Sequence, residues 1–267
     1  MTRPQAPVTR PRDTPAKQAR AARIAGILQA LSRHGLLLKQ DKRLPSVVTL
    51  VTGEALRTSW WSHPEAREIF AILSELSEHP DVLFSKLLLG KDTLVHRRLW
   101  PAFLAVARAS EGWQRRGLDP AARALLRSVE RSRASVRASG PAVRRLEARL
   151  LLRAEEVHTP SGRHEMVVET WASWSERAGV GAAPSVAEGK RALAQAALAL
   201  GAPLSALPWV ASAASPSSSS PSPATREPAG SAPRSGRSRR GWGGSDRAPG
   251  GPRGARRDRS MARRRRP

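Results

Sequence analysis

Residues 155–165, EEVHTPSGRHE, hold the densest group of acid and imidazole side chains in the chain. Imidazole and carboxylate ligands suit many divalent metals, so a helix–turn–helix here could gather a metal ion. The spacing of the two histidines matches no established zinc or iron motif. Helix caps and solvated charges at a turn explain the same residues, so we assign no metal ligand and no cofactor. The residues concerned are Glu155, Glu156, His158, His164 and Glu165.

Residues 82–99 form a second candidate site, of a different kind. Two β-prone runs, 82–89 and 93–99, flank a short connection containing Gly90, which predicts a β-hairpin. Alternate strand residues face opposite sides, and we expect basic side chains on one side to meet the phosphates of a nucleic acid. The alternative is a solvated edge, because basic residues commonly protect edge strands from pairing. The predicted contacts are Lys86, Lys91, His96 and Arg98.

Two adjacent tryptophans, Trp60 and Trp61, stand in LRTSWWSHPEAREIF at residues 56–70, just before a charged helix. Ser62 and Glu65 have the spacing of a capping box, which puts Trp61 where a hydrophobic staple folds back onto the helix. Trp60 is then expected to be the freer of the two. With Arg57 beside it, Trp60 is a candidate platform for an unpaired base.

Trp113, with Arg115 and Arg116, forms a similar aromatic and basic group in EGWQRRG at residues 111–117. Surfaces of this kind are the usual platforms for single-stranded nucleic acid. The alternative for both Trp60 and Trp113 is that the rings fold over the edge of the core. We predict Arg57, Trp60, Trp113, Arg115 and Arg116 as nucleic-acid contacts.

Recognisable catalytic motifs are absent from the sequence. It contains no phosphate-binding loop, dinucleotide fingerprint or nucleophile elbow, so we assign no catalytic residue. It contains no cysteine, which excludes disulfides, thiolate zinc sites and cysteine nucleophiles. These observations favour a non-enzymatic protein.

The net charge of +24 is concentrated at the ends of the chain. Residues 211–267 hold 14 arginines against three acidic residues, in a context rich in Pro, Ser and Gly. Such a segment buries too little apolar surface to offset its conformational entropy, so we predict disorder for 1–19 and for 211–267. Arg-rich tails bind polyanions without sequence preference. A GC-rich coding sequence or a misread frame would give the same composition.

Apolar spacing and caps place most elements between the tails. We predict helices over 20–34, over 46–52 (with a strand as the alternative), from the Ser62 cap to residue 78, and from residue 100. The rest reads as helical, with starts at Asp119 and Ser185. The chain is thus mainly α with one hairpin: one domain over 20–110, then an antiparallel helical bundle over 111–210.

The order helix, short helix, helix, hairpin and helix in residues 20–100 resembles the winged-helix superfamily of DNA-binding domains. The resemblance implies that the basic hairpin is a wing and that the chain binds DNA. The helix at 63–78 departs from this pattern, because it carries four glutamates against Arg67 alone. Carboxylates facing phosphates lower affinity, so this helix suits a wing-based contact or a protein-contact module facing a basic partner.

The sequence therefore predicts a non-enzymatic, nucleic-acid-associated protein that uses the hairpin and the tails, with DNA favoured over RNA. The alternatives are a protein-interaction module and, third, an enzyme that acts on nucleic acid. No apolar stretch reaches the length that a transmembrane helix requires. We expect a soluble, bacterial-type protein in the cytoplasm, with no membrane partner.

Overall fold

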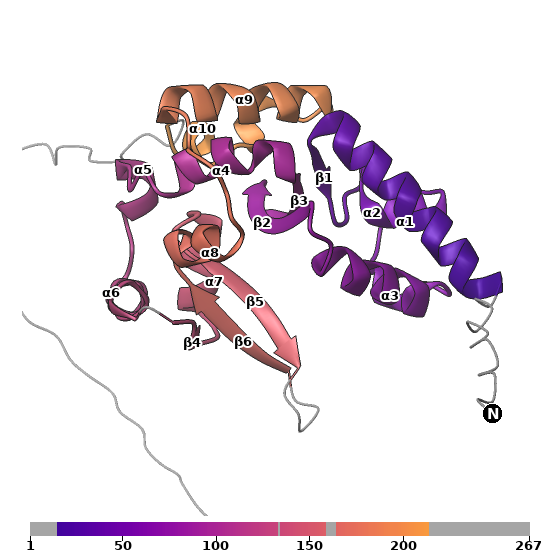
Figure 1. Ribbon diagram of the computed structural model, residues 1–267, viewed down its shortest axis with the longest axis horizontal. Helices are drawn as coiled ribbons and strands as arrows, with labels where there is room; N and C mark the ends of the chain where they lie inside the picture. The colour runs from indigo at the N-terminus through magenta and orange to yellow at the C-terminus, as the bar shows by residue number, and fades with distance from the viewer. Residues whose placement is uncertain (1–14, 133, 159–163, 214–267) are drawn as a thin grey trace, which may run out of the picture. The chain divides into compact units, whose positions relative to one another are not determined.

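The computed structural model describes residues 15–132, 134–158 and 164–213. The chain divides between Ser218 and Ser219, and all described residues lie on the N-terminal side of that division. The described part is mainly helical, with two small antiparallel sheets (Figure 1). The segments predicted to be disordered were 1–19 and 211–267, and their residues 1–14 and 214–267 lie outside the described residues. The prediction is wrong for 15–19 and 211–213, which belong to helices at Pro15–His34 and Pro208–Ala213. No helix among the described residues is long and apolar enough to cross a membrane.

The N-terminal half runs through three helices and a three-stranded sheet. Its elements are α1 (Pro15–His34), β1 (Leu36–Leu38), α2 (Val47–Thr52), α3 (Ala66–Ser77), β2 (Val82–Leu88) and β3 (Lys91–His96). Helix α1 begins five residues earlier than predicted and ends before Gly35, whose φ is +81°. The helical interpretation of 46–52 is confirmed, because the Ser46 side chain caps α2 and Gly53 ends it in the left-handed region.

The first sheet has the strand order β1-β3-β2, with both pairs antiparallel. The predicted hairpin is confirmed as β2 and β3. Its second strand ends at His96, and the next three residues form a 3-10 helix, η2 (Arg97–Leu99). Strand β1 was not predicted: its three leucines are all buried, so they show no alternation.

The main core lies where this sheet meets two helices, α4 (Trp100–Ala107) and α9 (Val186–Ala199). Helices α4 and α9 lie side by side (Figure 1). Gly189 permits the close approach, because a Cβ there would lie 2.6 Å from the carbonyl oxygen of Ala102. Tryptophan and phenylalanine rings from α4 and α8 (Trp171–Arg177) pack edge to face beside them.

The second half is not all helical, so that prediction is wrong. Helix α7 (Pro141–Ala148) ends early, and Leu150 turns the chain with a φ of +53°. A β-hairpin follows, and the strand order of its sheet is β4-β6-β5. The remaining elements are α5 (Gly112–Arg115), α6 (Pro120–Arg131), β4 (Val136–Arg137), β5 (Arg153–His158), β6 (His164–Glu169), η3 (Leu204–Ala206) and α10 (Pro208–Ala213).

A second, smaller core lies between α6, α7 and this sheet. Leu126, Val129, Leu146 and Val168 are among its buried residues. The predicted cap of α6 is confirmed, since the Asp119 carboxylate accepts a hydrogen bond from the backbone N–H of Ala122. The predicted capping box at the start of α9 is also confirmed.

Candidate nucleic-acid interface

The two adjacent tryptophans have opposite environments, and the prediction that Trp60 is the freer one is wrong. Both belong to a 3-10 turn, η1 (Trp60–Ser62). The Trp60 side chain is 5% exposed and belongs to the main core, whereas Trp61 is 62% exposed. Their rings stack, with centroids 4.0 Å apart and planes 25° from parallel. Trp60 is thus an anchor beneath an exposed indole.

The predicted capping box of α3 is wrong, for a local reason. The Ser62 hydroxyl donates back to the carbonyl of Ser59 at 2.8 Å, so it does not cap the helix. The Nδ1 atom of His63 accepts from the N–H of Glu65 instead. Helix α3 therefore starts at Ala66, and Trp61 lies too early in the chain to act as its staple.

Several hydrogen bonds fix the loop that carries Trp61. The Ser59 side chain accepts from the Trp61 N–H at 3.4 Å, and the Gln40 amide donates to the carbonyl of Thr58 at 2.8 Å. Trp61 also approaches Phe70 of α3, with ring centroids 5.8 Å apart and planes tilted by 38°. Phe70 is itself 41% exposed. Both rings are therefore preorganised at the surface.

Trp61 and Phe70 border a cleft of about 1,110 Å³. Residues of α3 and β2 line one part of it, and residues of α7 and β5 line another. Trp60, Trp100 and Trp174 also contribute to its lining. The volume and the aromatic content suit a planar organic group.

Asp92 of β3 lies in this cleft between two lysines. Its carboxylate oxygens lie 2.5 Å from Lys86 Nζ and 3.2 Å from Lys39 Nζ. Burial alone would raise the pKa of Asp92, but the charges and hydrogen bonds of the two lysines outweigh it and lower this pKa. Asp92 is therefore ionised at neutral pH, and it neutralises part of the basic hairpin.

Glu147 of α7 lines the same cleft and behaves in the opposite way. Burial raises the pKa of Glu147, and the nearby charge of Asp92 adds to the rise, against the opposing charges of Lys86 and Arg144. Two carboxyl groups in one cleft therefore have pKa shifts of opposite direction. Nothing in the sequence indicated this pair, since Glu147 is one of many charged residues on a helix.

The remaining cations of the hairpin are also engaged. Lys91 Nζ lies 2.7 Å from the carboxylate of Asp41, and Arg97 lies 3.8 Å from that of Asp81. Arg98 donates to a backbone carbonyl of α1. Burial, together with the charge of Arg98, lowers the pKa of His96, so its ring is neutral at pH 7. The structure does not gather Lys86, Lys91, His96 and Arg98 into one unpaired basic face.

The second predicted aromatic platform is largely buried in local contacts. Trp113 is partly buried against Trp209 of α10, and its indole N–H donates to Glu111 at 2.7 Å. Arg115 pairs with Glu130 at 3.2 Å, whereas Arg116 is exposed. Arg57 is also exposed, on the loop before η1. Arg57 is therefore exposed while Trp60 is buried, and Trp113 is less exposed than Trp61.

The acidic helix α3 faces the basic helix α1. Arg20 forms ion pairs with Glu68 at 2.8 Å and with Glu75 at 3.4 Å, and Arg23 forms one with Glu65 at 2.9 Å. Three of the four glutamates in this region are therefore paired within the chain. This arrangement weakens both the predicted repulsion of phosphates and the alternative in which the helix captures a basic partner.

The stretch 155–165 forms a hairpin instead of a turn between helices. Residues 159–163 lie outside the described part, and the Cα register pairs His158 with His164. Glu155 pairs with Arg153 and Glu165 with Arg137, both at 2.8 Å. Among the described residues, no three acidic or imidazole groups are placed to hold a metal ion.

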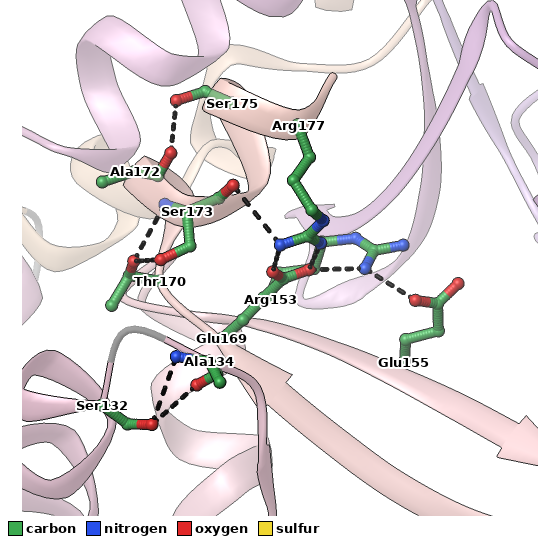
Figure 2. Close-up of polar contacts among 10 residues, drawn as sticks. All are labelled: Ser132, Ala134, Arg153, Glu155, Glu169, Thr170, Ala172, Ser173, Ser175 and Arg177. Carbon is green, nitrogen blue, oxygen red and sulfur yellow. Dashed lines mark hydrogen bonds and ion pairs between the residues drawn. The ribbon is translucent and has the colours of Figure 1, made fainter. Parts of the chain in front are cut away.

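A buried ion-pair cluster supports the cleft wall at the end of β6. Figure 2 shows the carboxylate of Glu169 between the guanidinium groups of Arg153 and Arg177. Both contacts are short, at 2.9 Å and 2.7 Å, and the Glu169 side chain is 5% exposed. The cluster ties β5, which lines the cleft, to α8.

Comparison of the chain with protein-family models, curated proteins and solved structures finds no match. Inference about its function therefore rests on the geometry of the cleft and of the exposed surface.

Proposed function

We propose that the protein is a non-enzymatic nucleic-acid-associated protein that holds an unpaired base against Trp61. The observation that carries this proposal is an indole ring 62% exposed and stacked at 4.0 Å on a buried neighbour. Stacking of a base on an aromatic side chain contributes about 1–3 kcal/mol and tolerates any sequence. Trp60 holds the platform in place, so little side-chain entropy is lost on binding.

The charge of the cleft favours a base over a phosphate group. As many acidic as basic side chains line it, and Lys86 is already paired with Asp92. A neutral aromatic base meets no net repulsion there, whereas a phosphate would meet the nearby carboxylates. Contacts with the backbone must come from cationic surfaces outside the cleft, and the Arg-rich segment 211–267 supplies one such source.

The order of elements supports a winged-helix-like domain. Three helices, a short strand between the first two, and a hairpin follow one another, and the sheet order is β1-β3-β2. In this proposal the hairpin is structural, because Lys86, Lys91 and Arg97 are each paired with a carboxylate. The Trp61 loop, between α2 and α3, takes over the contact with the ligand.

Fluorescence anisotropy with a labelled single-stranded oligonucleotide, and with a blunt duplex of the same length, tests the proposal on the full chain. We expect tighter binding to the single strand. Trp61→Ala should weaken it about 5- to 150-fold, the equivalent of about 1–3 kcal/mol. Trp61→Phe keeps a ring and should retain most of the affinity.

Leu204→Ala is the matched control, because Leu204 is also a large exposed apolar residue, on η3. It should bind like the original chain. Equal binding of single strand and duplex, unchanged by Trp61→Ala, would refute the proposal. A protein-contact module is the competing function, favoured by the same exposed Trp61 and Phe70. It predicts that oligonucleotide binding comes from the Arg-rich tail alone and is unchanged by Trp61→Ala.

A further inference from the structure

Helix α6 carries three exposed arginines at intervals of four residues: Arg123, Arg127 and Arg131. Residues four apart lie on the same side of a helix, so the three guanidinium groups follow one another along its outer surface. The inner surface is apolar, and its Ala122 and Leu126 pack into the second core. We call the outer set the α6 arginine row.

The α6 arginine row differs from the hairpin in having few partners. The side chains of Arg127 and Arg131 form no hydrogen bond or ion pair with any residue that the structure describes. Arg123 donates to the backbone carbonyl of Leu118 at 2.6 Å and keeps its charge uncompensated. The one acidic residue within the helix, Glu130, pairs with Arg115. The positive field of this surface is therefore not cancelled locally.

The dimensions of the row fit the backbone of a nucleic-acid strand. Eight residues of helix separate Arg123 from Arg131, which corresponds to about 12 Å along the axis. In a strand stacked as in B-form DNA, which rises about 3.4 Å along the helix axis per nucleotide, this distance corresponds to roughly three to four phosphates. An anionic membrane suits the surface less well, because interfacial helices insert large apolar residues. Here the large apolar residues Leu126 and Val129 face the core.

We propose that the α6 arginine row is a docking surface for the phosphate backbone of nucleic acid. The proposal rests on the proposed function, since it assumes that nucleic acid is the partner. It adds a surface that sequence patterns did not single out. Each guanidinium neutralises one phosphate and releases counterions, so the row contributes mainly to the salt-dependent part of binding.

The test is the salt dependence of single-strand binding by the full chain, measured as log Kobs against log salt concentration. The slope is negative, and each lost phosphate contact makes it shallower by about 0.7 for single strands. Replacing all three arginines by glutamine should therefore make the slope shallower by about 2. The matched control replaces Arg43, Arg108 and Arg191, which are exposed at separate places: before α2, just after α4 and on α9. It should leave the steepness of the salt dependence nearly unchanged.

An unchanged slope in the row variant, or an equal loss in the matched control, would overturn the proposal. Replacing the three arginines by lysine keeps the charge and should keep the slope. A shallower slope in the lysine variant would mean that the change acts through the structure of helix α6, which would also count against the proposal. Binding to phosphatidylserine vesicles that requires the row, with no effect on the oligonucleotide slope, would reassign the surface to membranes. If the slope becomes shallower as expected while Trp61→Ala has no effect, the base contact fails and the row stands.

Discussion

Glu169 gives the most direct test of how the cleft wall is held. Its carboxylate accepts from Arg153 at 2.9 Å and contacts Arg177 at 2.7 Å, and only 5% of its side chain is exposed. Glu169→Ala removes the acid that lies nearest to two guanidinium groups, and the Arg153 side chain, only 16% exposed, loses its buried partner (Figure 2). The substitution should therefore lower the free energy of unfolding substantially.

The magnitude follows from burial. Removing one partner of a buried ion pair costs about 3–5 kcal/mol. Arg153 keeps Glu155 at 2.8 Å, and the Arg177 side chain is 60% exposed, so both cations are partly compensated. We expect the lower end, about 3 kcal/mol. Since 1 kcal/mol moves the Tm of a domain of 150–250 residues by about 2–4 °C, the Tm should fall by roughly 6–12 °C.

Urea unfolding followed by circular dichroism measures this loss, with thermal unfolding as a second observable. Glu176→Ala is the control, because Glu176 is an exposed carboxylate on the same helix α8. Its effect should stay within about 0.5 kcal/mol. A loss below about 1 kcal/mol for Glu169→Ala, or one equal to that of Glu176→Ala, would refute the role given to the cluster.

Three further predictions concern stability, and each is checked by urea unfolding of the full chain. Trp60→Ala should cost about 3–5 kcal/mol, as expected for a buried aromatic residue; a loss under 1 kcal/mol would contradict its role as an anchor. Gly189→Ala should cost about 1–3 kcal/mol despite the better helix propensity of alanine, because the new Cβ would lie 2.6 Å from the Ala102 carbonyl oxygen; a stabilised variant would show that α4 and α9 can separate freely. The pKa of Asp92 is lowered in the folded state. Ionised Asp92 therefore stabilises the fold at pH values above its unfolded pKa, near about 4. This stabilisation disappears as the pH falls through the folded pKa. Asp92→Asn should therefore lose less stability between pH 6 and pH 3 than the original chain does, and parallel losses would count against the ion pairs.

Local signals in the sequence predicted much of the fold. The helix stop at Gly35, the Asp119 cap and the capping box at Ser185 all depend on residues within one turn, and all three are confirmed. The hairpin at 82–96 was predictable because two β-prone runs flank a short turn. Such features are determined by the nearest neighbours along the chain.

Most of the missed features depend on residues far apart in sequence or on backbone conformations that side chains do not signal. The capping box at Ser62 is the exception, since its hydroxyl bonds the nearby Ser59 carbonyl. Helix α7 stops before Leu150, a non-glycine residue with a φ of +53°, so the helical prediction for the second half was wrong from this residue to the end of β6. Asp41 neutralises Lys91 from 50 residues away. The choice between Trp60 and Trp61 depended on which one reaches the core, and a pair of identical residues gives no sign of that.

Photocrosslinking most directly tests the claim that an unpaired base stacks on Trp61. A single-stranded oligonucleotide containing 5-iodouracil is crosslinked to the full chain, and the tryptic peptides are then analysed by mass spectrometry. We expect a crosslink at Trp61, in the peptide 58–67, and we expect Trp61→Ala to abolish it. Crosslinks confined to residues 211–267, with none in that peptide, would contradict it.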